Sequence, residues 1–430
     1  MQLLAVGDLH LGRRPGRLPD AVLNRLGEQA LGPGGALDRL VAAAIRERVD
    51  VVVFTGDVVD QDDDFFEAFA QLRRAVARLV EAGIRVVGVA GNHDVRVLPQ
   101  LVQDVPGFLL LGADGTWEHV TLTAGSGVTI ELHGWSFPGP RVTTSPLAGV
   151  AIRPEARPAL GLLHCDRDQH GSDHAPVASR ELADAGLDAW LLGHIHKPDA
   201  LSPTNPGGYL GSVTALRASE TGARGPWHYQ IDHGGIHSVT HWPLAPLRWE
   251  AVDIDISNLE RADDIRPRII NAAQAAASTL AGDRFRPDVL GLRLRLHGRT
   301  RLSRQIENLL TADELGDLPL DGGIQGFVGR WWLDTRPTVD LDALARQSNP
   351  AGLLARRLLL LDQAPDSDPE RQALIERARR HLSTVRRDAA WTPIDPSDPS
   401  DAAIADWLRR GAVAALDELL SQQQDEEESA

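Results

Sequence analysis

Five short apolar runs, each ending abruptly in polar residues, constrain the fold of this chain more than any other feature. Runs of this length that are rich in Val, Ile and Leu are typical of strands buried on both faces. The runs are LLAVGDLH at 3–10, VDVVVFTGD at 49–57, IRVVGVAGNHD at 84–94, LGLLHCD at 160–166 and LDAWLLGHIH at 187–196. Because every run ends in Asp, Asn or His, we expect these polar side chains to gather where the strands end.

Helical patterns lie between some of these runs. Residues 36–49 and 65–83 carry apolar side chains at helical spacing, and Gly83 is a plausible terminator of the second helix. Alternation of strands and helices predicts βαβ units with largely parallel pairing. In such sheets the working residues lie beyond the carboxyl ends of the strands, which is where the polar residues of the five runs fall.

The domain organisation follows from length and from the distribution of histidine. A chain of 430 residues is too long for one simple core, and of its 15 histidines only His297 and His381 lie after about residue 245. We predict a catalytic domain over 1–245 and a β-α-β module over 246–300, with strands at 248–256 and 288–298 around a helix at 263–280. A mostly helical region over 301–430 would follow, with a linker at 391–401 and a disordered acidic tail, DEEE, at 425–428.

Charge and cysteine content limit the cellular compartment and the kinds of partner that we expect for this chain. The formal net charge of −16 disfavours tight binding to polyanions, because non-specific nucleic-acid binding is mostly phosphate neutralisation. Cys165 is the single cysteine, which rules out an internal disulfide and fits a reducing compartment. The sequence begins without a signal peptide and contains no apolar run of membrane-spanning length, so we expect a cytoplasmic protein with no membrane partner.

The strand ends together supply a set of side chains that suits divalent metal ions. Mixed imidazole, carboxylate and amide ligands without thiolate are typical of Mn²⁺, Fe²⁺ or Zn²⁺. Seven candidates are too many for one tetrahedral ion but fit two ions that share a carboxylate and hold a bridging water against a phosphate. The glycines before Asp57, Asn92 and His194 would let the backbone approach the ions closely. The seven candidate ligands are Asp8, His10, Asp57, Asn92, His164, His194 and His196.

These motifs, in this order, resemble those of the calcineurin-like metallophosphoesterases. The opening DLHLG and the spacing are similar to the SbcD branch, the nuclease subunit of bacterial SbcCD-type repair complexes. The segments GLLHCDRD, LLGHIHKPD and ETGARGP resemble a YhaO-like subgroup. The resemblance covers about the first 245 residues closely and the β-α-β module more loosely. It implies an α/β metallophosphoesterase fold, a two-sheet β-sandwich flanked by helices, with a capping module and a helical C-terminal region.

The resemblance also implies roles for individual residues. Asp57 would bridge the two ions, and His93 would be the acid that protonates the leaving oxygen. Asp60 and Asp94 would only support their neighbours; the archaeal and eukaryotic counterparts carry a histidine at the position of Asp60. Mn²⁺ is the ion we most expect, with Fe²⁺, Zn²⁺ or Mg²⁺ as alternatives. The implied ligand sets are Asp8, His10, Asp57 and His196 for one ion, and Asp57, Asn92, His164 and His194 for the other.

Several polar residues near these motifs can be interpreted either as functional residues or as parts of solvated loops. Arg13, Arg14 and Arg17 are candidates for contacts with a substrate phosphate, although an ordinary solvated loop explains them equally well. His170 and His174 lie in a polar segment and are interpreted as solvated loop residues rather than ligands.

The function predicted first is a two-metal phosphodiesterase, a DNA exonuclease or endonuclease that works with an SbcC-like coiled-coil ATPase. The resemblance suggests that the helical tail docks on that ATPase and that the chain forms a homodimer. The residues leave two alternatives open. One is a phosphatase or cyclic-nucleotide phosphodiesterase, which the acidic charge favours; the other is a regulatory binding subunit of the ATPase with weak or no catalysis.

Overall fold

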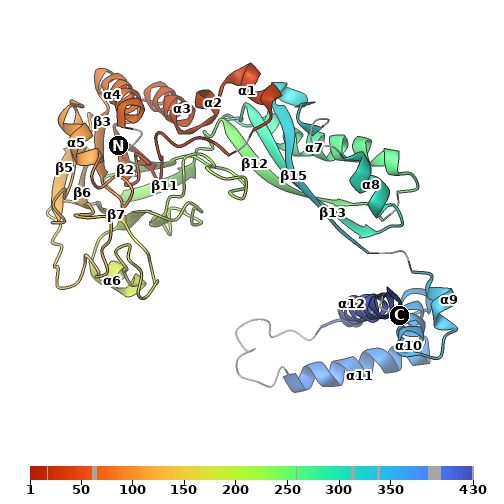
Figure 1. Ribbon diagram of the computed structural model, residues 1–430. Helices are drawn as coiled ribbons and strands as arrows, with labels where there is room; N and C mark the ends of the chain where they lie inside the picture. Colours follow the sequence, from red (N-terminus) through yellow and green to blue (C-terminus); the bar gives the residue numbers. More distant parts are fainter. Residues whose placement is uncertain are drawn as a thin grey trace. The chain divides into compact units, whose positions relative to one another are not determined.

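The computed structural model describes residues 1–16, 18–60, 65–257, 259–310, 315–336, 339–385 and 399–428. They form two compact units, which we describe separately (Figure 1). The first unit contains Met1–Ile254, Arg261–Leu296 and Arg304–Leu333. The second contains Asp255–Glu260, His297–Ser303 and Asp334–Ala430.

A six-stranded sheet forms one layer of the first unit, in the order β11-β10-β1-β2-β3-β4. Strands β1 to β4 pair in parallel, and β10 runs antiparallel to β1. The first three apolar runs form β1, β2 and β3, as their pattern predicts. The strands are β1 (Gln2–Val6), β2 (Val51–Thr55), β3 (Arg85–Val89), β4 (Phe108–Leu110), β10 (Trp227–Asp232) and β11 (Gly235–His241).

A five-stranded sheet, in the order β5-β6-β7-β8-β9, forms the second layer. Leu3 and Val53 of the first sheet lie in one buried cluster with Leu132, Leu162 and Leu191 of the second. The two-sheet sandwich predicted from the resemblance is therefore confirmed. The strands are β5 (Glu118–Thr123), β6 (Thr129–Trp135), β7 (Ala159–His164), β8 (Ala189–Gly193) and β9 (Gly208–Tyr209).

Helices cover the outer faces of the sandwich. Leu40 of α3 and Leu72 of α4 pack with Val52 and Phe54 of β2, and both predicted helices are confirmed, although Phe66 of α4 is 85% exposed. On the other face, Leu182 of α6 packs against the second sheet. The helices are α1 (Asp20–Leu26), α2 (Glu28–Leu31), α3 (Pro33–Arg46), α4 (Phe65–Glu81), α5 (Leu98–Gln103) and α6 (Ser179–Asp184).

A smaller four-stranded sheet, in the order β12-β13-β15-β14, follows the sandwich. The three elements that the alternation predicts are present as β12, α7 and β13. The hydrophobic pattern does not predict β15, because GFVGRWWLDTR lacks a regular alternation. The elements are β12 (Leu247–Asp255), η2 (Ala262–Asp264), α7 (Ile265–Ala281), β13 (Val289–Arg299), α8 (Ser303–Leu309), β14 (Leu318–Pro319), η4 (Asp321–Gly323) and β15 (Gln325–Arg336).

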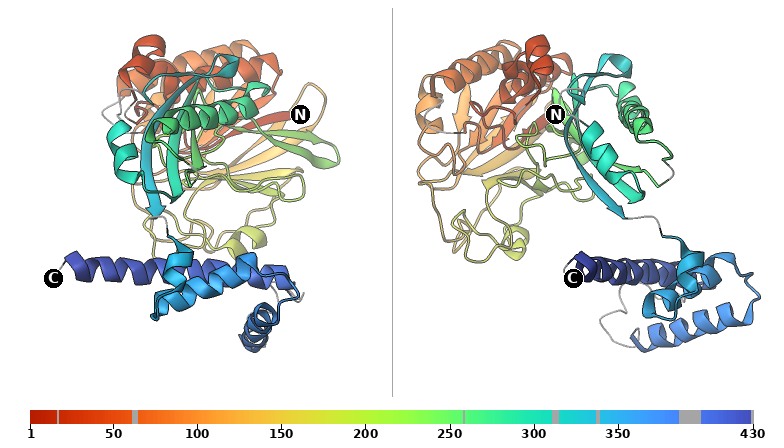
Figure 2. Two further views of the ribbon diagram at one scale, coloured as in Figure 1. Left: turned by 90° about the vertical axis from the view of Figure 1, so that its right-hand side faces the viewer. Right: turned by 45° about the vertical axis from the view of Figure 1, so that its right-hand side comes forward.

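The helices of the second unit are drawn in blue in Figure 2. They are α9 (Leu341–Ala345), α10 (Pro350–Gln363), α11 (Pro369–Val385) and α12 (Asp401–Glu428). The prediction of a disordered acidic tail is wrong for residues 425–428, because the backbone of α12 continues through them. Of the predicted linker, residues 391–398 lie outside the described residues. Within the described part of the chain, no helix has the length and apolar character needed to cross a membrane.

His241 at the end of β11 makes the fold sensitive to acid. Its ring lies 4.7 Å from that of Trp227, its Nε2–H donates to the Gly225 carbonyl at 3.1 Å, and burial lowers the pKa of His241 to about 4. Between pH 6.5 and 4 the unfolded chain binds a proton that the folded chain excludes, so stability falls as the pH falls. From pH 7.5 to pH 5 we expect this group to remove about 2 kcal/mol of unfolding free energy.

Urea unfolding of metal-free protein at these two pH values measures the effect. The variant His241→Asn should lose correspondingly less stability over this interval than the wild type. The matched control is His237→Asn on the same strand, whose side chain is 52% exposed. Equal pH dependence in the wild type and in His241→Asn would contradict the assignment.

Candidate metal centre

The candidate ligands come from the ends of strands in both layers of the sandwich. Asp8 follows β1, Asp57 follows β2 and Asn92 follows β3 in the first sheet, while His164 ends β7 in the second. The fifth run supplies His194 and His196 directly after β8. Backbone hydrogen bonds connect the loops that follow β1 and β2, since the amides of Leu9 and His10 donate to the Asp57 carbonyl at 3.0 and 2.9 Å. The structure brings all seven residues into one centre.

The imidazoles of this centre meet in two pairs. The Nε2 atoms of His10 and His196 lie 3.1 Å apart, and His164 Nε2 lies 3.2 Å from His194 Nδ1. Asn92 Oδ1 lies 3.0 Å from the same His164 Nε2. Ring nitrogens that face one another repel unless a proton or a cation lies between them, so each pair marks a position suited to a positive charge.

The second nitrogen of each ring is held by an oxygen acceptor. A histidine that donates one ring N–H to such an acceptor directs the lone pair of its other nitrogen at a metal, and partners of this kind are usual for metal-binding histidines. Hydrogen bonds thus fix the tautomer and direction of His10, His164 and His196, while the ring of His194 lies beside a carboxylate. The pairs are His10 Nδ1 with Asp60 Oδ1 at 2.8 Å, His164 Nδ1 with the Thr55 carbonyl at 3.1 Å, His194 Nε2 with Asp166 Oδ1 at 3.2 Å, and His196 Nδ1 with Glu220 Oε1 at 3.0 Å.

The two carboxylates lie between the imidazole pairs. Asp57 Oδ2 is 3.4 Å from His164 Nε2 and 3.7 Å from His10 Nε2, so it faces both pairs, as a bridging ligand must. Asp8 is fully buried; its Oδ1 accepts the amide of His194 at 2.8 Å, while its Oδ2 has no hydrogen-bond partner among the described residues.

A buried carboxylate oxygen without a partner is unfavourable, and a bound cation would satisfy it. The ligand atoms of Asp8, His10 and His196 lie within 4.8 Å of one another, and so do those of Asp8, Asp57 and His164. The residues present therefore fit two divalent ions held by nitrogen and oxygen. Which ion each side chain binds stays a prediction.

The protonation states of the buried groups are strongly coupled. Burial alone would raise the pKa of Asp57, but the charge of His164 and its hydrogen bond lower it well below the ordinary range. Burial opposes the charged form of His164, yet the Asp57 carboxylate raises the pKa of His164 to about 9. At neutral pH without metal, His164 thus holds a proton where a cation would bind, and metal binding must release it.

The backbone of the centre is strained and tightly packed. His10, Asp57 and His194 have φ values of 54°, 48° and 98°, a region that non-glycine residues rarely adopt and that is often associated with functional sites. The glycines before Asn92 and His194 leave no space for a side chain. A Cβ at Gly91 would lie 2.2 Å from Asp57 Oδ1, and one at Gly193 would lie 2.1 Å from the Thr55 carbonyl oxygen.

His93 lies at the rim of the centre. Its side chain is 38% exposed, its Nδ1 lies 3.1 Å from the Asp60 carbonyl oxygen, and its ring lies 5.1 Å from that of His10. Its amide donates to Asp57 Oδ1 at 3.0 Å. Because Nδ1 is held by the Asp60 carbonyl, Nε2 is the nitrogen that can reach a substrate.

The two predicted supporting carboxylates behave differently. Asp60 accepts hydrogen bonds from His10 Nδ1 and, at 3.3 Å, from Arg13. Asp94 does not bind the imidazole of His93; its carboxylate accepts the amides of Val58 and Gly91 at 2.6 and 2.7 Å. Burial, and then the charge of Asp57, raise the pKa of Asp94 to about 7. Asp94 therefore fixes the loops that carry Asp57 and Asn92.

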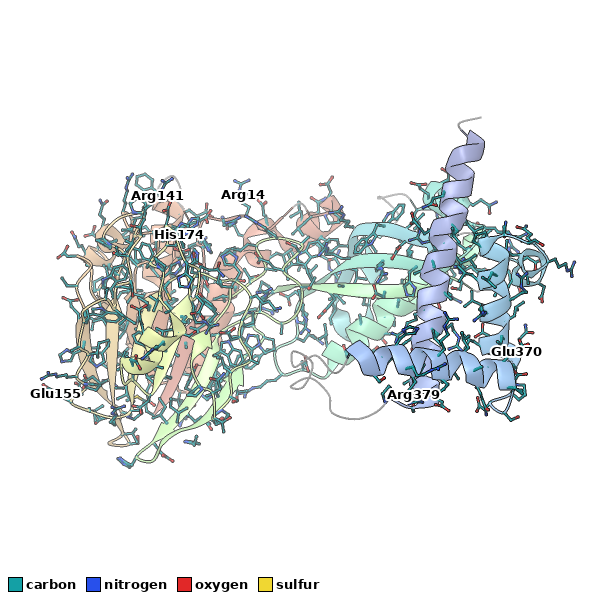
Figure 3. The ribbon with its side chains drawn as sticks, turned by 90° about the horizontal axis from the view of Figure 1, so that it is seen from below. Arg14, Arg141, Glu155, His174, Glu370 and Arg379 are labelled. Carbon is teal, nitrogen blue, oxygen red and sulfur yellow. The ribbon has the colours of Figure 1, made fainter. Side chains whose placement is uncertain are left out.

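The three candidate arginines are not equivalent. Arg13 lies beside the centre, where its guanidinium bonds to Asp60, and its side chain is 25% exposed. Arg14, labelled in Figure 3, is 81% exposed, and its guanidinium lies 3.5 Å from the carboxylate of Glu28 in α2. Arg17 lies outside the described residues.

The sequence interpretation missed three residues that support the ligands. Asp166 directly follows the apolar run of β7, so its place at a strand end was a usable signal. Glu220 and Arg224 lie in the segment ETGARGP, whose resemblance to the YhaO-like subgroup was the available signal, although nothing in it indicated a contact with His196. The Arg224 guanidinium, in a residue that is 4% exposed, donates to the His196 carbonyl, and the Gly222 amide donates to the Trp249 carbonyl of β12 at 2.8 Å.

We expect Glu220→Gln to weaken the binding of one metal ion by about tenfold, because losses of 10- to 100-fold are typical when a partner of a ligating histidine is changed. The neutral amide holds His196 Nδ1 less firmly and lowers the basicity of the ring. Calorimetric titration of metal-free protein with Mn²⁺ measures both affinities. The control is Glu67→Gln, an exposed residue of α4. Unchanged affinities would show that Glu220 does not support the ligand.

Two parts of the chain match known protein families. Residues 1–198 match the family of calcineurin-like phosphoesterases, and residues 249–318 match the family described as metallophosphoesterase YhaO, middle domain. A Bacillus subtilis protein named "Uncharacterized metallophosphoesterase YhaO" is 26% identical over 263 residues, which are 60% of this chain and 64% of the relative.

Two archaeal relatives are named "DNA double-strand break repair protein Mre11". The one from Methanopyrus kandleri is 25% identical over 63% of this chain and 62% of the relative. The one from Saccharolobus solfataricus is 27% identical over 51% of this chain and 54% of the relative. The chain thus spans less than two thirds of the length of these relatives.

Among solved structures, a dimetal phosphatase from Danio rerio covers 56% of this chain and 98% of its own, with 13% identity and a TM-score of 0.33, too low to argue from. The family match over residues 1–198 contains all seven candidate ligands at the strand ends of the sandwich. Over residues 1–198 the chain is therefore similar to the calcineurin-like phosphoesterases, and its donor set fits a metal-dependent hydrolase.

Proposed function

We propose that this protein hydrolyses phosphodiester bonds with two divalent metal ions, and that its substrate is DNA. The observation that carries the proposal is the converging set of seven nitrogen and oxygen ligands with one half-exposed imidazole, that of His93, at its rim. A purely structural metal site would not need an open acid beside it.

When bound, two such ions polarise a phosphate and lower the pKa of a coordinated water. Side chains of the protein position the ligands and supply the acid. Asp57 faces both ligand sets and fixes their separation, while Asp60 and Glu220 hold His10 and His196 in place. His93 Nε2 gives a proton to the leaving oxygen, and the Asp60 carbonyl keeps the proton of His93 Nδ1 in place.

DNA as the substrate is supported by the relatives rather than by the charge of the chain. Two of them carry names that refer to DNA double-strand break repair. The four-stranded sheet after the sandwich matches the YhaO middle domain over 249–318 and would cap the centre and select which DNA ends enter. We place this activity in the cytoplasm and expect Mn²⁺ as the ion, consistent with the lack of thiolate ligands.

A small phosphate ester is the second candidate substrate. The net charge of −16 favours it, because each acidic residue near the path of DNA raises the cost of bringing a polyanion to the centre. A phosphatase or cyclic-nucleotide phosphodiesterase would need the same ligands and the same acid.

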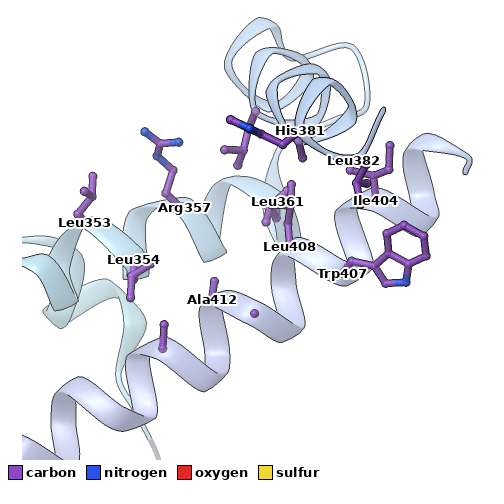
Figure 4. A pocket seen from close by; sticks show the side chains of 14 residues that line it. Leu353, Leu354, Arg357, Leu361, His381, Leu382, Ile404, Trp407, Leu408 and Ala412 are labelled. Carbon is purple, nitrogen blue, oxygen red and sulfur yellow. The ribbon is translucent and has the colours of Figure 1, made fainter. Parts of the chain in front are cut away.

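For the second unit we propose docking to a coiled-coil ATPase. Helices α10, α11 and α12 form an apolar groove lined by Leu361, Leu382 and Leu408 (Figure 4). Leu353 and Trp407, which also line the groove, are 49% and 46% exposed. An amphipathic helix can bury side chains of this kind. Binding of the purified ATPase should be lost in Leu353→Glu.

We also propose that the chain forms a homodimer. Sedimentation of the wild type alone tests this proposal.

The substrate proposal is tested by supplying linear single-stranded DNA, linear double-stranded DNA and bis-p-nitrophenyl phosphate in parallel, each with Mn²⁺ and with EDTA. We expect metal-dependent cleavage of DNA. Cleavage of the small ester alone, also after addition of the ATPase, would favour the second candidate. No hydrolysis by protein that holds two ions would leave only a regulatory subunit.

A further inference from the structure

A second histidine lies at the rim of the centre, on the side away from His93. His174 belongs to the polar loop after β7, and its backbone is fixed on both sides. Val142 and His174 form a β-bridge, the Asp166 amide donates to the His174 carbonyl at 2.9 Å, and the Ala175 amide donates to the Val142 carbonyl at 2.7 Å. The position of this residue, which is labelled in Figure 3, is therefore built into the fold.

The imidazole of His174 packs against a candidate ligand and stays open. Its ring lies 4.9 Å from that of His194, and its Nδ1 lies 3.8 Å from Asp166 Oδ2. The side chain is 37% exposed, and within the described residues the ring forms no hydrogen bond. His170 in the same loop is exposed, as the sequence predicts, whereas His174 is not simply a solvated loop residue.

The surroundings of His174 repeat those of His93. His93 is 38% exposed and its Nδ1 lies 3.8 Å from Asp60 Oδ1, the atom that binds His10. His174 is 37% exposed and lies 3.8 Å from the carboxylate of Asp166, which binds His194. Each half of the centre thus has a ligand histidine, a carboxylate that holds it, and an open imidazole that contacts its ring.

We propose that His174 binds the substrate phosphate from the His194 side and favours diesters over monoesters. This inference rests on the proposed function. A phosphodiester has two ester arms; one leaves, on the side of His93, and the other stays on the phosphorus atom. An imidazole on the opposite side can donate its N–H to a non-bridging phosphate oxygen, which inorganic phosphate also carries, and its ring can pack against the retained arm, which a monoester lacks.

Inorganic phosphate is the first probe, because its binding does not require turnover. Calorimetry with Mn²⁺-loaded protein should show about tenfold weaker binding in His174→Ala, the loss typical of a hydrogen bond to a charged group. The control His170→Ala should bind phosphate as the wild type does. Both variants should retain two manganese ions per chain, which a role in holding the ions would not allow.

Hydrolysis of bis-p-nitrophenyl phosphate and of p-nitrophenyl phosphate then tests the preference. In His174→Ala we expect kcat/KM for the diester to fall about tenfold further than that for the monoester. Equal losses for the two esters would overturn the role in diester preference. Wild-type phosphate affinity in His174→Ala, or loss of a manganese ion, would overturn the phosphate contact.

The two proposals fail in different ways. If the wild type binds phosphate through His174 but hydrolyses no ester, the proposed function fails and the phosphate contact stands. If the wild type hydrolyses diesters while His174→Ala behaves as His170→Ala does, the inference fails and the proposed function stands. If the manganese-loaded wild type neither binds phosphate nor hydrolyses an ester, both are overturned.

Discussion

Replacing His93 by alanine should slow cleavage of a phosphodiester with an alcohol leaving group by roughly 10²- to 10⁴-fold, the contribution usual for a positioned acid. The imidazole is half-exposed, its Nδ1 is fixed by the Asp60 carbonyl, and its Nε2 faces the space where a substrate would lie. An alkoxide is a poor leaving group without a proton. The loss should therefore appear in kcat, with both metal ions still bound.

The leaving group provides an internal control for this role. A p-nitrophenolate ion departs without help, so hydrolysis of bis-p-nitrophenyl phosphate by His93→Ala should fall much less than cleavage of DNA or of an alkyl diester. A matched variant is His237→Ala, an exposed histidine of β11. Equal losses for both leaving groups would show that His93 binds substrate or metal and is not an acid.

The exchange of Asp57 for asparagine should eliminate hydrolysis, with a loss of at least about 10³-fold, because the ions supply several kcal/mol of transition-state stabilisation. Asp57 Oδ2 lies 3.4 Å from His164 Nε2 and 3.7 Å from His10 Nε2, so the variant weakens both ligand sets. Asparagine has the same shape but no charge to attract two cations. Metal analysis should find fewer than two ions per chain.

Thermal unfolding gives a second measurement of the same effect. Ions that bind only the folded chain raise Tm in proportion to the logarithm of their concentration, so Mn²⁺ should stabilise the wild type and EDTA should reverse this. The shift should be strongly reduced in Asp57→Asn and unchanged in Asp38→Asn, whose side chain is 68% exposed on α3. A full complement of ions in Asp57→Asn would contradict the bridging role.

The sequence predicts the sandwich and the place of its centre because both depend on local patterns. Apolar runs that end in Asp, Asn or His indicate buried strands, and the carboxyl ends of parallel strands lie at one edge. The runs over 3–10, 49–57 and 84–94 became adjacent strands, and the polar residues at their ends contribute to one centre, where Asp57 Oδ2 lies 3.7 Å from His10 Nε2. That a second sheet packs against the first was predicted from the resemblance of these motifs to the metallophosphoesterases.

What the sequence does not predict depends on contacts between distant segments. Glu220 orients His196 from 24 positions further along the chain, and no periodicity marks it. Likewise, β15 pairs with β13 although its own residues lack the alternation of a half-buried strand. His174 was indistinguishable from His170 by sequence, because only the folding of the loop against β7 places it on the ring of His194.

The central claim is that two ions at this centre hydrolyse a phosphodiester. The most direct test measures hydrolysis of bis-p-nitrophenyl phosphate while metal-free protein receives increasing equivalents of Mn²⁺ and the bound ions are counted. We predict that the rate rises as the second ion binds, reaches a plateau at two ions per chain, and stays at background in Asp57→Asn. Full hydrolysis without metal, or none with two ions bound, would contradict the account.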